Sequence, residues 1–375
     1  MTPILPGATI GILGNGQLGR MTAQAAIRMG YNVACYGPDS TPTPCGQAGA
    51  REVQGAYDDL VALAAFAQSV DVMTFEFENV STAATDVASQ HIPVHPSGAV
   101  LHTTQDRIRE KAALVDAGIP VAPYSVVHQV SDLEAGPFPG ILKTAQSGYD
   151  GKGQRMVHNV SEATDALNAF GGVPCVLEGL VPFLWEGSVV GARNAAGDVA
   201  LYPLVQNIHT HHILDTTLVP APLASKELQA SAAELAVRIL DSLDVIGVLC
   251  IEMFITENGI IVNELAPRPH NSGHWSIEGA VTSQFEQHVR AVCGLPLGST
   301  DLRAPAAAMA NLLGDCWPEP DFVGALADPR VSLHLYGKQE ARAGRKMGHL
   351  TAVGPTVDDA VQAVNAARTR LKAAE

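Results

Sequence analysis

The segment Gly247–Pro267, GVLCIEMFITENGIIVNELAP, carries the clearest structural signal in the chain. Two runs rich in Ile, Val, Met and Phe flank Glu257-Asn258-Gly259, which predicts a three-residue hairpin loop with the glycine in a left-handed conformation. In that register the numbers of paired residues sum to 516, so Glu252 faces Glu264. Directly opposed carboxylates lie about 5 Å apart at Cβ and repel each other. Such a hairpin needs a counter-charge.

A hard divalent cation would supply that counter-charge. Mg²⁺ binds carboxylate and phosphate oxygens, and buried charges in proteins are generally paired or coordinated. Two alternatives remain open from the sequence: one glutamate stays protonated, or a slip of one residue in the register separates them. We predict that Glu252 and Glu264 bind Mg²⁺, with Mn²⁺ as an alternative metal.

The bulk composition excludes several classes of protein. The chain has 375 residues, of which 47% are hydrophobic, so we expect two or three globular domains. A net charge of −15 disfavours a nucleic-acid partner. We find no apolar run long enough to span a membrane and no basic signal-peptide region at the start. The six cysteines form no C-x-x-C pair and suit buried positions in a reducing compartment, which predicts a cytoplasmic protein.

Strand and helix patterns divide the chain into three predicted regions of an α/β protein. Residues 1–98 alternate short apolar strands with helices, which is typical of βαβ units and a parallel, Rossmann-like sheet. Residues 99–182 suit a linking helix followed by a small α+β subdomain. Residues 183–375 predict a large antiparallel sheet with a helix at Lys226–Asp241, two further strands after about residue 300 and a final helix near 357–373.

The N-terminal region contains the pattern G-x-G-x-x-G at Gly14–Gly19, between a strand and a helix. Asp39 follows about 20 residues later, as in the dinucleotide-binding fingerprint. The same glycines would also suit another anion at a helix N-terminus, or a plain tight turn. An NAD-dependent dehydrogenase is therefore one alternative function.

Further candidate residues lie at strand ends and in glycine-rich or basic loops. Glu76 and Glu78 end a predicted parallel strand, where open α/β sheets bind ligands. The connection 142–157 contains Lys143, Lys152 and three glycines, as a lid over phosphates would. Glu178 and Glu186 flank an apolar stretch suited to a base, and a basic cluster suited to a phosphate follows later in the chain: Lys338, Arg342, Arg345 and Lys346. Each feature also has a plain alternative: a solvated strand end, an ordinary long hairpin, two surface carboxylates and a solvated basic loop.

Together these features resemble the ATP-grasp superfamily. Longer strings are similar to the 5-(carboxyamino)imidazole ribonucleotide synthetase family: GNGQLGRM, GYDGKGQ, VPFLWEGSVV, NIHTHHILDTT, NELAPRPHNSGHW and YGKQEARAGRKMGH. They run in order from about residue 10 to 350, over nearly the whole chain. The resemblance implies an ATP-grasp fold: an N-terminal Rossmann-like (pre-ATP-grasp) domain, a small α+β lid subdomain and a C-terminal antiparallel-sheet domain.

The resemblance also implies site residues. Those for ATP are Arg107, Lys143, Gly148, Tyr149, Asp150, Gly151, Lys152, Gly153, Gln154, Glu178, Gly179, Leu180, Val181, Glu186, His209, Asn263 and Glu264. Those for aminoimidazole ribonucleotide are Glu76, Tyr149, Asp150, Lys152, Arg268, His270, Asn271, Lys338 and Arg345. Arg268, His270 and Lys338 are the expected catalytic residues, and Glu252 and Glu264 the expected metal ligands.

The implied reaction is the ATP-dependent carboxylation of 5-aminoimidazole ribonucleotide by bicarbonate through carboxyphosphate, in de novo purine biosynthesis. The resemblance further implies a homodimer whose product passes to a separate mutase. Formate-dependent glycinamide ribonucleotide transformylase is the alternative within the superfamily. The chain departs from the pattern of the family it resembles at Lys152, where many members have Arg, and at Ala266, where ATP-grasp enzymes often place a metal-binding Asn.

Overall fold

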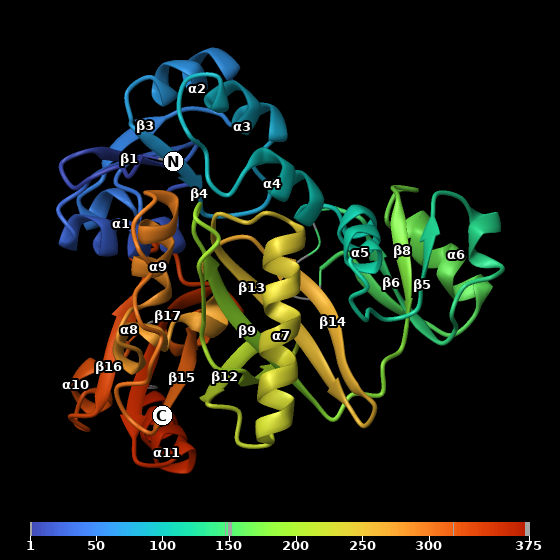
Figure 1. The fold of residues 1–375 in the computed structure, drawn as a ribbon. Helices are drawn as coiled ribbons and strands as arrows, with labels where there is room; N and C mark the ends of the chain where they lie inside the picture. The colour runs from blue at the N-terminus through green and yellow to red at the C-terminus, as the bar shows by residue number, and fades with distance from the viewer. Residues whose placement is uncertain (1, 147, 149–151, 318, 372–375) are drawn as a thin grey trace.

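A parallel sheet forms the N-terminal part of the protein (Figure 1). The computed structural model describes residues 2–146, 148, 152–317 and 319–371. The sheet has the order β3-β2-β1-β4, with strands β1 Thr9–Leu13, β2 Asn32–Gly37, β3 Arg51–Gln54 and β4 Val72–Phe75. Its helices are α1 Gln17–Arg28, α2 Leu60–Ala67 and α3 Thr82–Ser89, with a 3₁₀ turn η1 at Gly46–Ala48. The predicted βαβ alternation is confirmed.

Two helices lead from this sheet to a small antiparallel sheet. They are α4 Gly98–Thr104 and α5 Arg107–Asp116, and each begins after a residue whose side chain caps it, Ser97 and Asp106. The small sheet has the order β5-β8-β6-β7, with β5 Tyr124–Val127, β6 Gly140–Thr144, β7 Gln154–Val157, β8 Cys175–Gly179, helix α6 Val160–Ala169 and η2 Val130–Leu133. The predicted α+β subdomain is therefore present.

The largest sheet has nine antiparallel strands in the order β14-β13-β9-β11-β12-β15-β17-β16, with β10 paired to β9. The strands are β9 Trp185–Arg193, β10 Val199–Leu201, β11 Val205–Thr210, β12 Ile213–Val219, β13 Gly247–Thr256, β14 Gly259–Ala266, β15 Ala306–Leu313, β16 Val331–Leu335 and β17 Lys346–Gly354. The helices are α7 Lys226–Ser242, α8 Ser276–Gly279, α9 Gln284–Val292, α10 Phe322–Ala325 and α11 Val357–Leu371, with η3 Asn271–Gly273 and η4 Gly314–Cys316. The tail after residue 300 contributes three strands, so the prediction of two was wrong.

The β13–β14 hairpin pairs Glu252 with Glu264 as predicted, but the path to that register differs. Thr256 pairs with Gly259, so the loop has two residues and not the predicted three. From Met253 to the tip of the hairpin, the numbers of paired residues therefore sum to 515. Continued along the strands, that register would place Asn263 opposite Glu252. A β-bulge between Glu252 and Met253 adds one residue on β14 and restores the sum of 516. Gly259 has φ 122°, so the expectation of a positive φ there is confirmed.

Helix α9 joins the N-terminal sheet to the large sheet. It packs against α1 and β4 on one side and against β9 and β13 on the other (Figure 1). Val289 and Val292 lie in the same buried cluster as Ile10 and Val33 of the parallel sheet. Inside the interface, His288 Nε2 hydrogen-bonds Thr74 Oγ1 at 2.7 Å, and its Nδ1 accepts from the Val248 backbone at 3.1 Å. Helix α9 thus bridges the two sheets, because His288 contacts β4 of the parallel sheet and β13 of the large sheet.

Two expectations from composition can be compared with this structure. All six cysteines are buried, as predicted. Among the described residues, no helix combines the length and the apolar character needed to cross a membrane.

Helix α7 supports the back of the carboxylate hairpin, and its core contact can be tested. Leu240 is fully buried against Gly191 of β9, in the cluster that contains Leu249 and Ile251. We expect Leu240→Ala to lower the stability by about 2–5 kcal/mol, because the cavity would form under two sheet strands. Thermal and urea unfolding would measure the loss. Leu223→Ala, at a position 62% exposed, is the matched control and should change little.

Candidate active site

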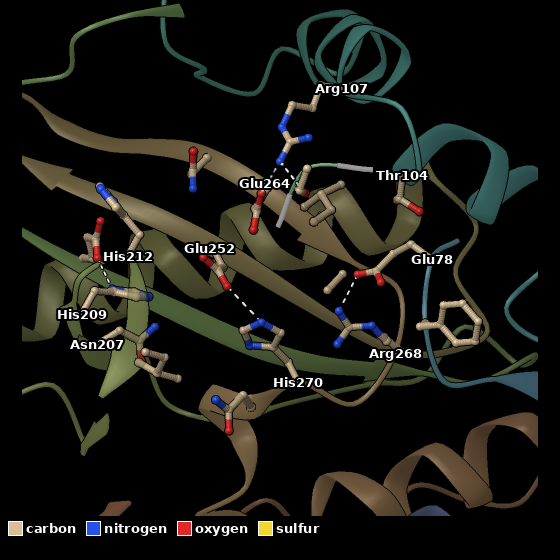
Figure 2. A pocket seen from close by; sticks show the side chains of 18 of the residues that line it. Glu78, Thr104, Arg107, Asn207, His209, His212, Glu252, Glu264, Arg268 and His270 are labelled. Carbon is tan, nitrogen blue, oxygen red and sulfur yellow. Dashed lines mark hydrogen bonds and ion pairs between the residues drawn. The ribbon is translucent and has the colours of Figure 1, made fainter. Parts of the chain in front are cut away.

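A cavity of about 1060 Å³ opens where the N-terminal sheet, α5, the small sheet and the large sheet meet. Its wall contains thirteen of the predicted site residues: Glu76, Arg107, Lys143, Gly148, Gln154, Glu186, His209, Glu252, Asn263, Glu264, Arg268, His270 and Asn271. Figure 2 labels side chains around this space that come from segments as far apart in the sequence as Glu78 and His270. The fold therefore brings most of the predicted residues into one site.

The two opposed carboxylates lie at the centre of the cavity, and each has a cationic neighbour. Glu252 Oε1 lies 3.0 Å from His270 Nε2, and Glu264 Oε2 lies 3.5 Å from Arg107 Nη2 (Figure 2). Burial alone would raise the pKa of Glu252, but His270 lowers it to about 2. Burial and the charge of Glu252 raise the pKa of Glu264. The pair thus keeps one strongly ionised carboxylate and one whose negative charge is penalised until a further cation approaches.

The donor set suits Mg²⁺. No group of three or more His, Cys, Asp or Glu side chains with metal-binding geometry is found within the described ranges. Two carboxylates facing an open cavity match an ion that usually keeps few protein ligands and takes the remaining oxygens from water and substrate phosphates. Neighbouring residues of a regular strand point to opposite faces of the sheet. The bulge breaks that alternation, so Asn263 and Glu264 both line the cavity.

Basic and apolar groups line the side of the cavity nearest the small sheet. Lys143 of β6 donates to Glu178 Oε2 at 3.1 Å and lies 3.5 Å from Asn263 Oδ1. Phe183 and Phe254 stack with ring centroids 4.8 Å apart and form an apolar wall. Such a wall beside fixed charges suits a flat base with a polyphosphate tail.

Glu186 of β9 contacts His209 of β11 on the same side of the cavity. Although burial lowers it, the pKa of His209 is raised overall by the hydrogen bond and charge of Glu186. Both residues were predicted from the resemblance, and both line the cavity.

Several predicted ATP residues are not part of the cavity wall. Glu178 is buried with its carboxylate turned toward lysines, and the following predicted residues also lie outside the lining: Gly179, Leu180 and Val181. Lys152 and Gly153 of the predicted lid likewise do not line the cavity, whereas Gly148 and Gln154 do. Tyr149, Asp150 and Gly151 lie outside the described residues.

The glycine loop is occupied by a side chain of the protein itself. Glu76, directly after β4, accepts hydrogen bonds from the backbone amides of Gly16 and of Gly19, the latter at 2.6 Å. Burial raises the pKa of Glu76, and the loop amides act in the opposite direction. A Cβ on Gly14, which has φ 119°, would lie 2.2 Å from Glu76 Cγ. The glycines therefore make room for a carboxylate.

This contact makes the dinucleotide interpretation of Gly14–Gly19 wrong. A pyrophosphate at this helix N-terminus would need the same amides, and it would meet a buried carboxylate at close range. Asp39, the expected ribose-binding partner, is exposed. The alternative that the motif serves a tight turn with an anion at the helix N-terminus is confirmed, with Glu76 as the anion.

Arg268 and His270 follow β14 and line the cavity. Arg268 Nη2 lies 2.5 Å from Glu78 Oε1, so the second carboxylate at the end of β4 holds this guanidinium (Figure 2). His270 is fixed through its backbone, because Gln284 Oε1 accepts from its N–H at 2.9 Å and Gln284 Nε2 donates to its carbonyl at 2.7 Å. Both groups are therefore held before any ligand arrives.

The basic loop between β16 and β17 is arranged differently from the prediction. Lys338 Nζ donates to the Lys346 carbonyl at 2.7 Å, and Arg345 donates to the Glu340 carbonyl at 2.8 Å. Neither Lys338 nor Arg345 lines the cavity, whereas Lys346, which was noted only as a member of the cluster, does. The cluster could be predicted from its composition, but the cation that faces the site could not.

Two further features of the cavity wall were missed. His211 and His212 have φ 51° and 63° and form the two-residue turn between β11 and β12. Such turns usually carry Asn or Gly, so the paired histidines were a recognisable signal within NIHTHHILDTT. Glu110 of α5 accepts from the Leu265 backbone at 3.0 Å. Burial and the charge of Glu264 raise its pKa to about 8.

Comparisons with known families agree with this architecture. Residues 7–105 match the ribonucleotide synthetase preATP-grasp domain, residues 112–285 the ATP-grasp domain and residues 307–363 the phosphoribosylaminoimidazole carboxylase C-terminal domain. The chain is 43% identical over 370 residues to N5-carboxyaminoimidazole ribonucleotide synthase of Bacillus subtilis (strain 168), covering 96% of this chain and 95% of the relative. It is 45% identical over 362 residues to the enzyme of that name from Brucella melitensis, covering 94% and 98%.

Solved structures give the same result. The N5-carboxyaminoimidazole ribonucleotide synthetase from Thermus thermophilus superposes with a TM-score of 0.89 at 42% identity, covering 98% of this chain and 99% of the other. The N5-carboxyaminoimidazole synthase from Aspergillus clavatus, in complex with ADP and 5-aminoimidazole ribonucleotide, gives a TM-score of 0.88 at 30% identity, covering 97% and 98%.

The raised pKa of Glu110 predicts a pH-dependent stability. A buried carboxyl with a folded pKa of about 8 contributes stability that is present below its unfolded pKa, near 4.5, and is lost as the pH rises through 8. Glu110→Gln keeps an acceptor for the Leu265 N–H and cannot ionise. We therefore expect the variant to gain melting temperature over the parent between pH 5 and pH 9 in metal-free buffer. Parallel curves would contradict this, and the exposed Glu234→Gln on α7 is the control.

Proposed function

Because the chain belongs to the family of N5-carboxyaminoimidazole ribonucleotide synthases, and so converts 5-aminoimidazole ribonucleotide to N5-carboxyaminoimidazole ribonucleotide with ATP, we propose that bicarbonate supplies the carboxyl group in this cavity. The proposal rests on the arrangement of charged side chains around the opposed carboxylates. The Glu252–Glu264 pair lies between Arg107 and Lys143 on one side and Arg268 and His270 on the other. A phosphoryl donor and an acceptor could meet there.

The need for ATP follows from the chemistry of bicarbonate, which is a poor electrophile. A bicarbonate oxygen attacks the γ-phosphorus of ATP, the bond to the β-phosphate oxygen breaks, and carboxyphosphate and ADP result. Phosphoryl transfer of this kind depends mainly on positioning and on charge neutralisation. In the proposed roles, Lys143 and Arg107 bind the nucleotide phosphates, and Phe183 and Phe254 contact the base.

We assign Mg²⁺ to Glu252 and Glu264. When bound, the ion neutralises charge on the transferring phosphoryl group and on the opposed carboxylates. Arg107 and His270 orient these carboxylates from either side through the contacts at 3.5 and 3.0 Å.

The acceptor step takes place on the other side of the pair. The exocyclic amine of aminoimidazole ribonucleotide attacks the carboxyl carbon, phosphate leaves, and the nitrogen loses a proton. We assign Arg268 and His270 to positioning bicarbonate and the amine, with Glu76 and Asn271 contacting the nucleotide. Lys346 joins Lys338 and Arg345 as a candidate for its 5′-phosphate.

Carboxyphosphate hydrolyses readily, so water has to be kept away from it. Gly148 and Gln154, at the two ends of the predicted lid 148–154, contribute to the cavity wall. We assign this segment to covering the nucleotide while the intermediate exists. The homodimer, the separate mutase and the cytoplasmic location stay predictions from the resemblance.

Phosphate release tests the carboxyl source and the rival acyl donor together. We expect ATP hydrolysis to be stimulated by aminoimidazole ribonucleotide plus bicarbonate, and ¹³C-bicarbonate to label the product. Glycinamide ribonucleotide plus formate should have no effect. Stimulation by the second pair, or product without label from bicarbonate, would overturn the proposal.

The metal assignment predicts opposite effects on stability and activity. Glu264→Gln removes the repulsion from Glu252, so the variant should melt at a higher temperature than the parent in metal-free buffer. We expect its kcat to fall by about a hundredfold or more, because one donor to a transition-state charge is lost. Its stabilisation by added Mg²⁺ should also shrink. The control is Glu257→Gln at the exposed tip of the same hairpin. An unchanged Mg²⁺ response in Glu264→Gln would rule out this residue as a ligand.

A further inference from the structure

Glu178 of β8 lies between two lysines from different elements. Lys143 Nζ of β6 is 3.1 Å from its Oε2, and Lys111 Nζ of α5 is 3.2 Å from its Oε1. The Lys111 side chain is 1% exposed and that of Glu178 is 5% exposed. One carboxylate is thus shared by two buried ammonium groups.

The two lysines differ in what they can reach. Lys143 lines the cavity and also approaches Asn263, whereas Lys111 and Glu178 do not line it. Lys111 Nζ has no hydrogen-bond partner of good geometry among the described residues, and it lies 5.9 Å from the centre of the Tyr124 ring. Its contact with Glu178 is therefore one of charge. Since Lys111 cannot touch a ligand in the cavity, any effect on the reaction must pass through its neighbours.

A count of charges shows what Lys111 contributes. Within these three residues, Glu178 carries one negative charge and the two lysines carry two positive charges, so one positive charge is left over. Beyond them, the charge of Lys143 acts on Glu264 and that of Lys111 on Glu110. Although burial acts in the opposite direction, both lysines hold the pKa of Glu178 below its usual value, so the carboxylate stays ionised. Without Lys111, Glu178 and Lys143 would neutralise each other.

We propose that Lys111 is a positioning residue that balances Glu178, so that the charge of Lys143 remains available to the phosphates of ATP. The inference rests on the proposed ATP site. A purely structural role explains the arrangement poorly, because a buried ammonium is costly and an apolar residue of similar length would fill the same space. The charge itself is what the site retains.

The test uses four variants of the full chain. Lys111→Met removes the balancing charge, and Lys111→Met with Glu178→Gln removes both charges and leaves Lys143 without an ionic partner there. Lys143→Met tests the proposed nucleotide contact itself. Arg109→Met removes a cation from the same helix that pairs with Asp106 at 3.2 Å, away from Glu178. Calorimetry with the non-hydrolysable analogue adenylyl imidodiphosphate gives Kd, kinetics give KM and kcat, and circular dichroism checks folding.

We expect Lys111→Met to weaken analogue binding by about tenfold, equal to about 1.4 kcal/mol, with KM for aminoimidazole ribonucleotide unchanged. The double variant should recover binding to within about threefold of the parent, because Lys143 regains its free charge. Arg109→Met should bind as the parent does. A structural role of Lys111 would not produce this recovery, since the double change removes more of the native contacts than the single one.

Two results would overturn the inference: normal binding in Lys111→Met, or weak binding that the double variant fails to restore. If Lys111→Met does not fold, the double variant decides, because our account requires it to fold and to bind. Lys143→Met separates the two levels of the proposal. Full binding in that variant would refute the nucleotide site, whereas its loss together with normal binding in Lys111→Met would refute the role of Lys111 alone.

Discussion

The site is organised by the enforced opposition of two like charges. Glu252 and Glu264 face each other across β13 and β14, and the repulsion between them is offset by His270, Arg107 and the proposed metal. Their opposition depends on a single extra residue, because the two-residue loop would otherwise place Asn263 opposite Glu252. The bulge therefore determines both the pairing of the two carboxylates and the direction of the Asn263 side chain. Arg107 and His270 lie beside the carboxylates and reduce the repulsion between them.

Helix α5 supplies much of the compensation, although its first five residues, 107–111, lie between the two matched family domains, which end at 105 and begin at 112. Arg107, Glu110 and Lys111 have the spacing i, i+3 and i+4, so they share one face of the helix. From that face Arg107 contacts Glu264, and Lys111 contacts Glu178. Glu110 accepts a hydrogen bond from the backbone N–H of Leu265, the residue after Glu264. One short helix thus connects the hairpin and the small sheet electrostatically.

Much of this arrangement could be predicted from the sequence, for identifiable reasons. Alternating apolar runs indicated the parallel and antiparallel sheets, and Glu252 and Glu264 were found because carboxylates are out of place in an apolar hairpin. The loop length was wrong, since a bulge leaves no mark in a strand pattern. Which lysine of the basic loop faces the cavity, and the pairing of Lys111, depend on side-chain directions set by contacts between distant elements. Periodicity carries no information about those contacts.

The carboxylate of Glu76 in the glycine loop limits how this domain could evolve. Any descendant that gained a dinucleotide site at Gly14–Gly19 would first have to lose Glu76, because phosphate and carboxylate would compete for the amides of Gly16 and Gly19. A protein that lost Glu76 first would have two backbone amides without an acceptor. A protein that kept Glu76 would repel a phosphate from the same amides, so each single change is unfavourable. A glycine motif in a sequence thus does not by itself identify the anion that its amides bind.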